Sequence, residues 1–243
     1  MQLVNKRIVI TGGTSGIGYE MVKYFHLENE VIVISLNEKK LAKLTKKFDK
    51  IIAYQCDLSK LKNTENVANA LIKRFKTIDL LVNNAASQSQ PAFLEDDFNY
   101  HTIAHEVTLN FTSICSLTYL ILPALLHQHK ATILNINSGL ALAPKTSSAI
   151  YCATKAALNV FSQSLSYQLE ETNISVQQAF LPMVDTSMTK GRGKNKISTQ
   201  EAVKKIVYGL ENNISEHDLG KVKLLRFLLR LAPALAKKIM KNY

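Results

Sequence analysis

The chain has 243 residues, of which 47% are hydrophobic and 20% are charged, a balance that indicates a folded globular protein and excludes an intrinsically disordered one. Its formal net charge of +11 is concentrated near the end, since residues 190–243 hold 13 of the 30 Lys and Arg residues and only 4 of the 19 Asp and Glu residues. This quarter predicts either an anionic partner or a solvated basic surface. The three cysteines, Cys56, Cys115 and Cys152, are odd in number and far apart, so we expect reduced thiols in a cytoplasmic protein, with no disulfide framework and no metal site.

Strand and helix patterns alternate along a chain whose length suits one large domain. Short runs rich in Ile and Val, typical of strands buried on both faces, occur at 7–10, 31–35, 51–54, 80–82, 132–136 and 174–179. Helical patterns lie between them at 18–27, 39–48, 63–75, 104–127 and 149–171. The alternation predicts an α/β, doubly wound Rossmann-type fold with a parallel sheet of six to seven strands. Because we find no signal-peptide layout and no uninterrupted apolar run of 18 residues, we expect no membrane-spanning helix.

A glycine-rich turn joins the first predicted strand to the first helix, with the sequence Thr11-Gly12-Gly13-Thr14-Ser15-Gly16-Ile17-Gly18. Glycines at such a turn let the chain bend tightly, let the backbone approach a pyrophosphate and let the helix pack on the sheet. The helix N-terminus then presents free N–H groups to phosphates. The spacing differs from the commoner G-x-G-x-x-G pattern, and a turn without a ligand is the alternative. Its place after the first strand favours dinucleotide binding.

Two further short segments with polar residues follow later strands. Asp57 and Leu58 come after the third strand, and Asn83-Asn84-Ala85-Ala86 comes after the fourth. Open α/β sheets bind ligands at the carboxyl ends of their strands, so we expect both segments near the glycine turn. Asp57 alone could equally cap a turn or a helix.

Tyr151 and Lys155 lie four residues apart in a predicted helix, so their side chains share one face. Tyr19 and Lys23 have the same spacing, but they lie in the glycine-loop helix, where we expect a surface position. A tyrosine has an ordinary pKa of about 10, and a nearby cation lowers that pKa. The pair at 151 and 155 is therefore a candidate general acid/base with its tuning charge.

Taken together, these motifs resemble the short-chain dehydrogenase/reductase family along nearly the full chain. TGGTSGIG resembles the family's cofactor loop, and NNAA resembles its NNAG with Ala86 in place of glycine. Asn110 matches the family's helix asparagine, and Ser138 precedes Tyr151 by the usual 13 residues. The tail also resembles that of the bacterial DltE-type oxidoreductases.

The resemblance implies an NAD(P)(H)-dependent oxidoreductase that interconverts a carbonyl and an alcohol by hydride transfer. Tyr151 would be the general acid/base, Lys155 would bind the nicotinamide ribose, Ser138 would donate to the substrate oxygen, and Asn110 would hold a water that links Lys155 to solvent. The implied cofactor-binding set is Gly12, Thr14, Ser15, Gly16, Ile17, Gly18, Leu36, Asn37, Asp57, Leu58, Asn83, Ala85, Tyr151, Lys155, Pro182, Val184 and Thr186.

The end of the second strand decides between the two nicotinamide cofactors. A carboxylate there holds the ribose diol of NAD, and an arginine suits the 2′-phosphate of NADP. Ser35 and Leu36 occupy these positions. Glu38 is better explained as an acidic residue in the first turn of the next helix, with Asn37 as its N-cap. Ser35, Asn37 and the following lysines suit a 2′-phosphate, so NADP(H) is favoured over NAD(H).

Family analogy puts the substrate pocket around 88–93, 140–144, Met183 and a mobile loop at 187–199. Its implied residues, namely Phe93, Ser138, Leu140, Tyr151 and Met183, are largely apolar and favour a hydrophobic carbonyl or alcohol. The basic loop favours instead an acidic substrate, and both remain open. Met183 stands where the family usually has glycine.

We assign residues 1–218 to one dinucleotide-binding and catalytic domain and 219–243 to a basic amphipathic helical extension. On a helical wheel, Lys223, Arg226, Arg230, Lys237 and Lys241 fall within about 60°, and Pro233 should break the helix. The extension could cover the core, pack in a subunit interface or lie on an anionic membrane; we expect that it does not bind nucleic acid.

Family members usually form dimers or tetramers, so we expect a homo-oligomer. The rival hypothesis is a catalytically retired member that senses a dinucleotide and binds a membrane or protein partner.

Overall fold

The computed structural model describes residues 3–242, which form a single seven-stranded parallel sheet in the order β3-β2-β1-β4-β5-β6-β7. The predicted α/β doubly wound fold is confirmed. The strands are β1 Arg7–Thr11, β2 Glu30–Ser35, β3 Ile51–Gln55, β4 Leu80–Asn83, β5 Ala131–Ser138, β6 Ile174–Leu181 and β7 Glu216–Asp218. The reversal of strand order beside β1 puts the carboxyl ends of β1 and β4 at the switch point, where such sheets bind ligands.

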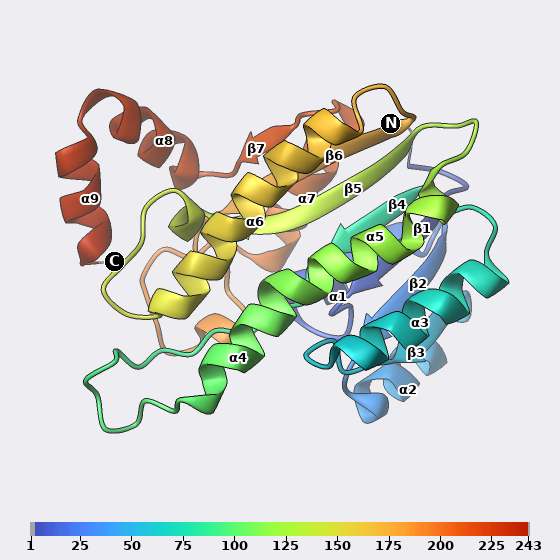
Figure 1. Ribbon diagram of the computed structural model, residues 1–243, viewed down its shortest axis with the longest axis horizontal. Coiled ribbons are helices and arrows are strands. Elements are labelled where there is room, and N and C mark those ends of the chain that lie inside the picture. Colours follow the sequence, from blue (N-terminus) through green and yellow to red (C-terminus); the bar gives the residue numbers. More distant parts are fainter. Residues whose placement is uncertain (1–2, 243) are drawn as a thin grey trace.

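Two layers of helices cover the sheet (Figure 1). One face carries α1 Gly16–Phe25, α2 Glu38–Lys47 and α7 Thr199–Glu211. The other carries α3 Leu61–Arg74, α4 His101–Val107, the π-helical stretch η1 Thr108–Thr112, α5 Ser113–Leu125 and α6 Ala149–Gln168. Short 3-10 turns, η2 Gly139–Ala141 and η3 Ser187–Thr189, follow β5 and β6.

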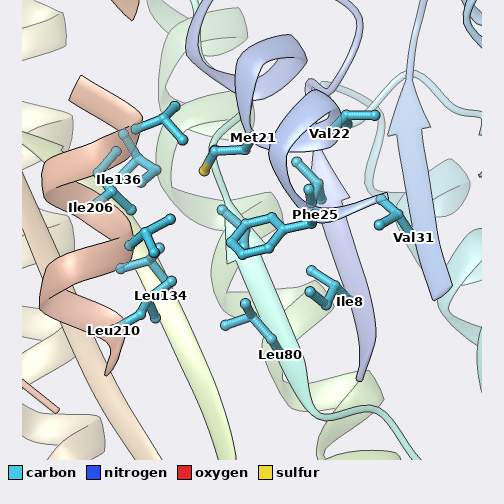
Figure 2. Packing of buried hydrophobic residues seen from close by; sticks show 14 of the residues in the cluster. Ile8, Met21, Val22, Phe25, Val31, Leu80, Leu134, Ile136, Ile206 and Leu210 are labelled. Atoms are coloured by element: carbon cyan, nitrogen blue, oxygen red, sulfur yellow. The ribbon is translucent and has the colours of Figure 1, made fainter. Parts of the chain in front are cut away.

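The sheet divides the apolar core in two because alternate strand residues point to opposite faces. Ile8 faces the α1 side, where it meets Phe25 and Leu80, whereas Val9 faces the α5 side. Figure 2 shows Phe25 and Met21 of α1 lying over the sheet, with α7 on the far side of the cluster. Each fully buried side chain of this size contributes about 1.5–3 kcal/mol, so the two layers hold the strand ends that carry the site.

The helical run His101–Leu125 is long and apolar enough to cross a membrane by length and composition alone, although polar residues interrupt its apolar sequence. In the structure Ile114, Leu117 and Ile121 of this run are buried beneath the sheet. That buried face accounts for much of the run's apolar composition.

Two short helices end the chain: α8 Lys221–Leu231 and α9 Pro233–Lys241. Pro233 is the first residue of α9, so the predicted break at this proline is confirmed. The end of α9 folds back onto the loop after β5 (Figure 1), where the backbone N–H and hydroxyl of Thr146 both donate to the carbonyl of Lys241, at 3.3 and 2.7 Å.

Candidate active site

A cavity of about 680 Å³ lies at the carboxyl ends of β1, β4, β5 and β6, a volume in the range of small-molecule sites. Most of the residues singled out in the sequence line it. They are Gly12, Ser15, Gly16, Ile17, Leu36, Asp57, Leu58, Ala85, Ser138, Leu140, Tyr151, Lys155, Pro182, Met183, Val184 and Thr186. They come from widely separated parts of the chain, and the sheet brings them together.

Six implied site residues do not line this cavity, and the side chains of five of them are used elsewhere. The Thr14 hydroxyl lies 2.8 Å from that of Ser35, and the Asn37 carbonyl accepts from the backbone of Lys40 as an N-cap. Asn83 turns into the sheet and donates to Asn135 at 2.8 Å, so its neighbour Asn84 lines the cavity instead.

Phe93, Asn110 and Gly18 are the other implied site residues outside the cavity lining. Phe93 stacks on Phe98 within the exposed segment that precedes α4, with ring centroids 4.6 Å apart. Phe93 therefore lies outside the cavity lining, and its part in a substrate pocket stays a prediction.

The glycine turn and the loop after β4 are joined by hydrogen bonds. The Thr11 hydroxyl accepts from the backbone N–H groups of Asn84 and Ala85, at 2.9 and 3.0 Å, and the Asn84 amide donates to the Thr11 carbonyl at 2.9 Å. Gly18 does not line the cavity, but it leaves no room for a side chain, since a Cβ there would meet the Gly12 carbonyl and the Asn84 amide. Its role is close packing of α1 on these loops.

The N-terminus of α1 points its N–H groups at the cavity. Ser15, the residue before the helix, makes no side-chain cap, and no acidic residue lies in the first turn. Gly16 has φ = +55°, a left-handed conformation that favours glycine, and a Cβ there would approach Thr186. The turn thus offers a phosphate-sized anion uncompensated donors and a positive helix end.

Tyr151 and Ser138 form the chemical centre of the cavity. The Ser138 side chain lowers the pKa of the Tyr151 hydroxyl, and the Ser138 oxygen accepts from the Leu140 backbone at 3.1 Å. Burial dominates, however, and raises the pKa of Tyr151 to about 12, with Cys152 and Glu106 also raising it and Arg192 lowering it. The protein alone therefore holds Tyr151 in its protonated form at neutral pH.

Lys155 lies beside Tyr151, with its Nζ atom 5.8 Å from the centre of the tyrosine ring. The ammonium donates at 2.8 Å to the carbonyl of Ile136 near the end of β5. Burial lowers the pKa of Lys155 to about 8. Burial of the Tyr151 hydroxyl outweighs the charges around it, and the tuning of its pKa by Lys155 stays a prediction.

Asn110 is fully buried in η1, a π-helical stretch that local 3.6-residue periodicity does not reveal. Its carbonyl accepts from Ser87 N–H at 2.9 Å, and its amide donates to the Ser87 carbonyl at 2.8 Å and to the Thr154 hydroxyl at 3.3 Å. Asn110 therefore positions the segment after β4, including Ser87 of the cavity wall, and its role in holding a water stays a prediction.

Several cavity residues were not recognised in the sequence. Lys145 and Arg192 reach it from the segment before α6 and from the 187–199 loop, and Val222, Leu225 and Met240 reach it from α8 and α9. The basic loop and the apolar stripe of the tail were the available signals, but neither indicated which residues turn inward. Among residues 3–242, no group of three or more potential ligands could hold a metal.

The cavity fits a dinucleotide cofactor on three observations. The glycine turn leaves a cradle that side chains would fill, the N–H groups of α1 lack a cap, and the Ser87 hydroxyl is buried at the cavity wall without a protein partner. Gly12, Ser15, Gly16 and Ile17 would hold its phosphates, and Tyr151 and Lys155 would face its reactive end. A Rossmann-type fold with such a site defines a dinucleotide-binding oxidoreductase.

Comparison with known proteins agrees with this class. A family model described as short chain dehydrogenase matches residues 6–197, and an uncharacterised oxidoreductase, DltE, of Bacillus subtilis is 35% identical over 93% of this chain and 92% of its own. The chain therefore belongs to the short-chain dehydrogenase family and is an oxidoreductase, as the sequence predicted.

Two solved structures share the fold. A short chain dehydrogenase of Burkholderia cenocepacia in complex with NADP has a TM-score of 0.89 at 21% identity, covering 100% of both chains. A short-chain dehydrogenase/reductase of Burkholderia phymatum in complex with NAD has a TM-score of 0.86 at 18% identity, covering 100% of this chain and 97% of that one.

Proposed function

We propose that the protein interconverts a carbonyl and an alcohol with a nicotinamide dinucleotide, with Tyr151 as the general acid/base. The observation that carries this is that Ser138, Tyr151 and Lys155 line one end of a cavity whose other end is the glycine turn. When bound, the reduced nicotinamide supplies the hydride to the carbonyl carbon. Tyr151 then donates its proton to the developing alkoxide, and Ser138 donates a hydrogen bond to the same oxygen.

Lys155 contributes position and charge. Its hydrogen bond to Ile136 fixes the ammonium between β5 and α6, where it can donate to a ribose hydroxyl. An oxidised nicotinamide carries positive charge and would favour the Tyr151 phenolate in the reverse reaction.

The test measures nicotinamide fluorescence during titration with NADPH and NADH, followed by a carbonyl screen. Tyr151→Phe should bind cofactor with unchanged affinity and lose at least about 100-fold in turnover, the usual value of general acid catalysis. Absence of binding for both cofactors would favour the rival function, a retired member that acts through its tail.

NADP(H) is the preferred cofactor in this proposal. At the end of β2, Leu36 is exposed and Ser35 lines the cavity with a hydroxyl, and the only acidic residue of the described cavity lining is Asp57. The Asp57 carboxylate accepts from the backbone and hydroxyl of Ser59, at 3.0 and 2.6 Å, so it is already engaged. A tighter complex with NADH than with NADPH would overturn the preference.

We propose that the protein is a homo-oligomer that pairs through α5 and α6. Both helices carry large apolar side chains on their outer faces, with Tyr119, Val160 and Tyr167 between 64% and 73% exposed. Such residues are typical of subunit interfaces. Sedimentation of wild type and of Val160→Lys compares the masses; a monomeric wild type would contradict the proposal.

We also propose a cytoplasmic location with peripheral contact to anionic membranes through α8 and α9. Five large apolar side chains of these helices are more than half exposed, namely Leu224, Phe227, Leu231, Leu235 and Ile239, and basic residues accompany them. The assay is co-sedimentation with vesicles rich in phosphatidylglycerol at low salt, with Leu231→Gln as the weakened variant. Equal recovery on zwitterionic vesicles, or no binding at all, would contradict this contact.

A further inference from the structure

The cavity has an uneven charge distribution that the catalytic residues do not explain. Its described lining includes the basic side chains Lys145, Arg192 and Lys221 in addition to Lys155, but only one acid, Asp57. Asp57 lies after β3, at the end that holds Leu36 and Ser35. Lys145 and Arg192 lie instead around Tyr151.

Arg192 is held in place by neutral acceptors. Its guanidinium donates to the side-chain carbonyl of Gln88 at 3.1 Å and to the backbone carbonyl of Met188. These contacts engage two of its five N–H donors and orient the fork without neutralising it. No ion pair of Arg192 with a carboxylate occurs within residues 3–242.

Lys145 faces Arg192 across the same part of the cavity. Burial lowers the lysine pKa, and the charge of Arg192 lowers it further, which means that the two cations act on one another. Arg192 also acts on the Tyr151 hydroxyl, and Lys145 acts on the thiol of the adjacent Cys152. Both cations are thus close to the reacting end, and neither belongs to an ion pair within the described part of the chain.

The buried acid Glu106 does not serve as their counter-ion. Glu106 is 2% exposed, its carboxylate accepts from the backbone of Ser89, and it lies behind the cavity wall rather than in its lining. It acts on Tyr151 and Cys152, and within the described residues it forms no ion pair with Lys145 or Arg192. Two partly buried like charges repel one another, so their juxtaposition favours an anion supplied from outside.

Resting on the function proposed above, we propose that Lys145 and Arg192 form an anion subsite for a carboxylate on the substrate itself. The free donors of Arg192 and the ammonium of Lys145 can each address one carboxylate oxygen, while the carbonyl of the same molecule reaches Tyr151. The rest of the cavity wall here is apolar, with Leu140, Val222, Leu225 and Met240. The substrate class is therefore an oxo or hydroxy acid with an apolar chain, which decides between the two options left open by the sequence.

The test is a matched pair of probes that differ only in charge, octanoate and octanamide, titrated calorimetrically into the protein with saturating NADP⁺. A charge-assisted contact in a partly buried site predicts that octanoate binds about 10- to 100-fold more tightly than octanamide. Arg192→Gln and Lys145→Gln should each reduce this preference to about 3-fold or less, whereas Arg192→Lys should retain part of it. Lys194→Gln, an exposed cation of the same loop outside the cavity lining, is the matched control and should keep the full preference.

Two results would overturn the subsite: equal affinities of the wild type for both probes, or an unchanged preference in both Gln variants. Titration of each variant with NADPH separates this failure from failure of the proposed function. A wild type that binds nicotinamide cofactor but shows no carboxylate preference overturns the subsite alone. A wild type that binds neither NADPH nor NADH overturns the proposed function and the subsite with it.

Discussion

The ammonium of Lys155 donates to the carbonyl of Ile136 at 2.8 Å, while the ring of Tyr151 lies 5.8 Å away. Lys155 is only 3% exposed, and burial lowers its pKa from 10.5 to about 8. At neutral pH the folded protein therefore keeps a charged lysine where a neutral side chain would be more stable. The geometry that serves catalysis costs stability.

Replacement of this lysine should stabilise the fold. We expect Lys155→Met to increase the free energy of unfolding at pH 7 by about 1–3 kcal/mol, less than the full pKa difference implies because the Ile136 carbonyl loses its donor. Activity should fall to background. The gain should be complete below pH 8 and shrink between pH 8 and 10.5, because there the wild-type lysine loses its proton in the folded state. Urea denaturation of both proteins across this range measures it; a variant less stable at pH 7 contradicts the argument.

Two charged residues near Tyr151 shift its pKa in opposite directions, so their removal should shift the pH–rate profile in opposite directions. Arg192 lowers the pKa of Tyr151, and Glu106 raises it. Alcohol oxidation requires the phenolate, so Arg192→Gln should move the rising limb of the pH–rate profile to higher pH and Glu106→Gln should move it to lower pH. Asp96→Asn, an exposed charge change outside the cavity, is the control. Shifts of the same sign in both Gln variants would mean that another group titrates.

Much of the fold is encoded in local apolar runs, and the parts that escaped prediction have physical reasons. The apolar run ends at Ile136, but β5 continues through Asn137 and Ser138 because these residues pair with Phe180 and Leu181 of β6. Likewise β7, Glu216–Asp218, has no apolar run at all. Its place in the sheet comes from tertiary pairing with β6.

Some residues of the candidate site could also be predicted from local sequence patterns, and others could not. Spacing brought Tyr151 and Lys155 together because one helix holds both, and strand order brought Ser138 beside them. The approach of Lys145 and Arg192, 47 residues apart in the sequence, depends on how two irregular segments fold, and no local pattern encodes it. The same is true of Val222 and Met240, which reach the cavity only because the tail folds back.

In the glycine turn, substitution of Gly18 by alanine should destabilise the fold, although helix propensity alone would predict stabilisation. In an exposed helix, Gly→Ala stabilises by about 1 kcal/mol, but Gly18→Ala would push a Cβ into the Gly12 carbonyl and the Asn84 amide. We expect a loss of about 1–3 kcal/mol in unfolding free energy and weaker NADPH binding, because both loops of the cofactor end must move. Gly191→Ala is the control: its φ of +76° costs about 1–2 kcal/mol, but open space surrounds it. Equal loss of NADPH affinity in both variants would contradict the steric explanation.

Arg226 attaches the C-terminal helices to the sheet and so predicts a link between tail docking and substrate binding. Its guanidinium pairs with Asp218 of β7 at 2.5 and 2.9 Å and with Glu216 at 2.8 Å, and it lies 4.8 Å from the ring centre of Phe180 in β6. Val222 and Leu225 of the same helix line the cavity. A loosened α8 would therefore open the apolar wall on the substrate side.

We expect Arg226→Met to speed tryptic cleavage within 221–241 and to raise KM several-fold with little change in kcat, because Tyr151 and Ser138 lie on other elements. The partly exposed ion pairs should contribute only about 1 kcal/mol to global stability. Arg230→Met, which removes an exposed charge from the same helix, should leave both KM and cleavage unchanged. If Arg226→Met lowers kcat with KM unchanged, α8 influences the reacting groups rather than the substrate wall, and the assigned role of the tail is wrong.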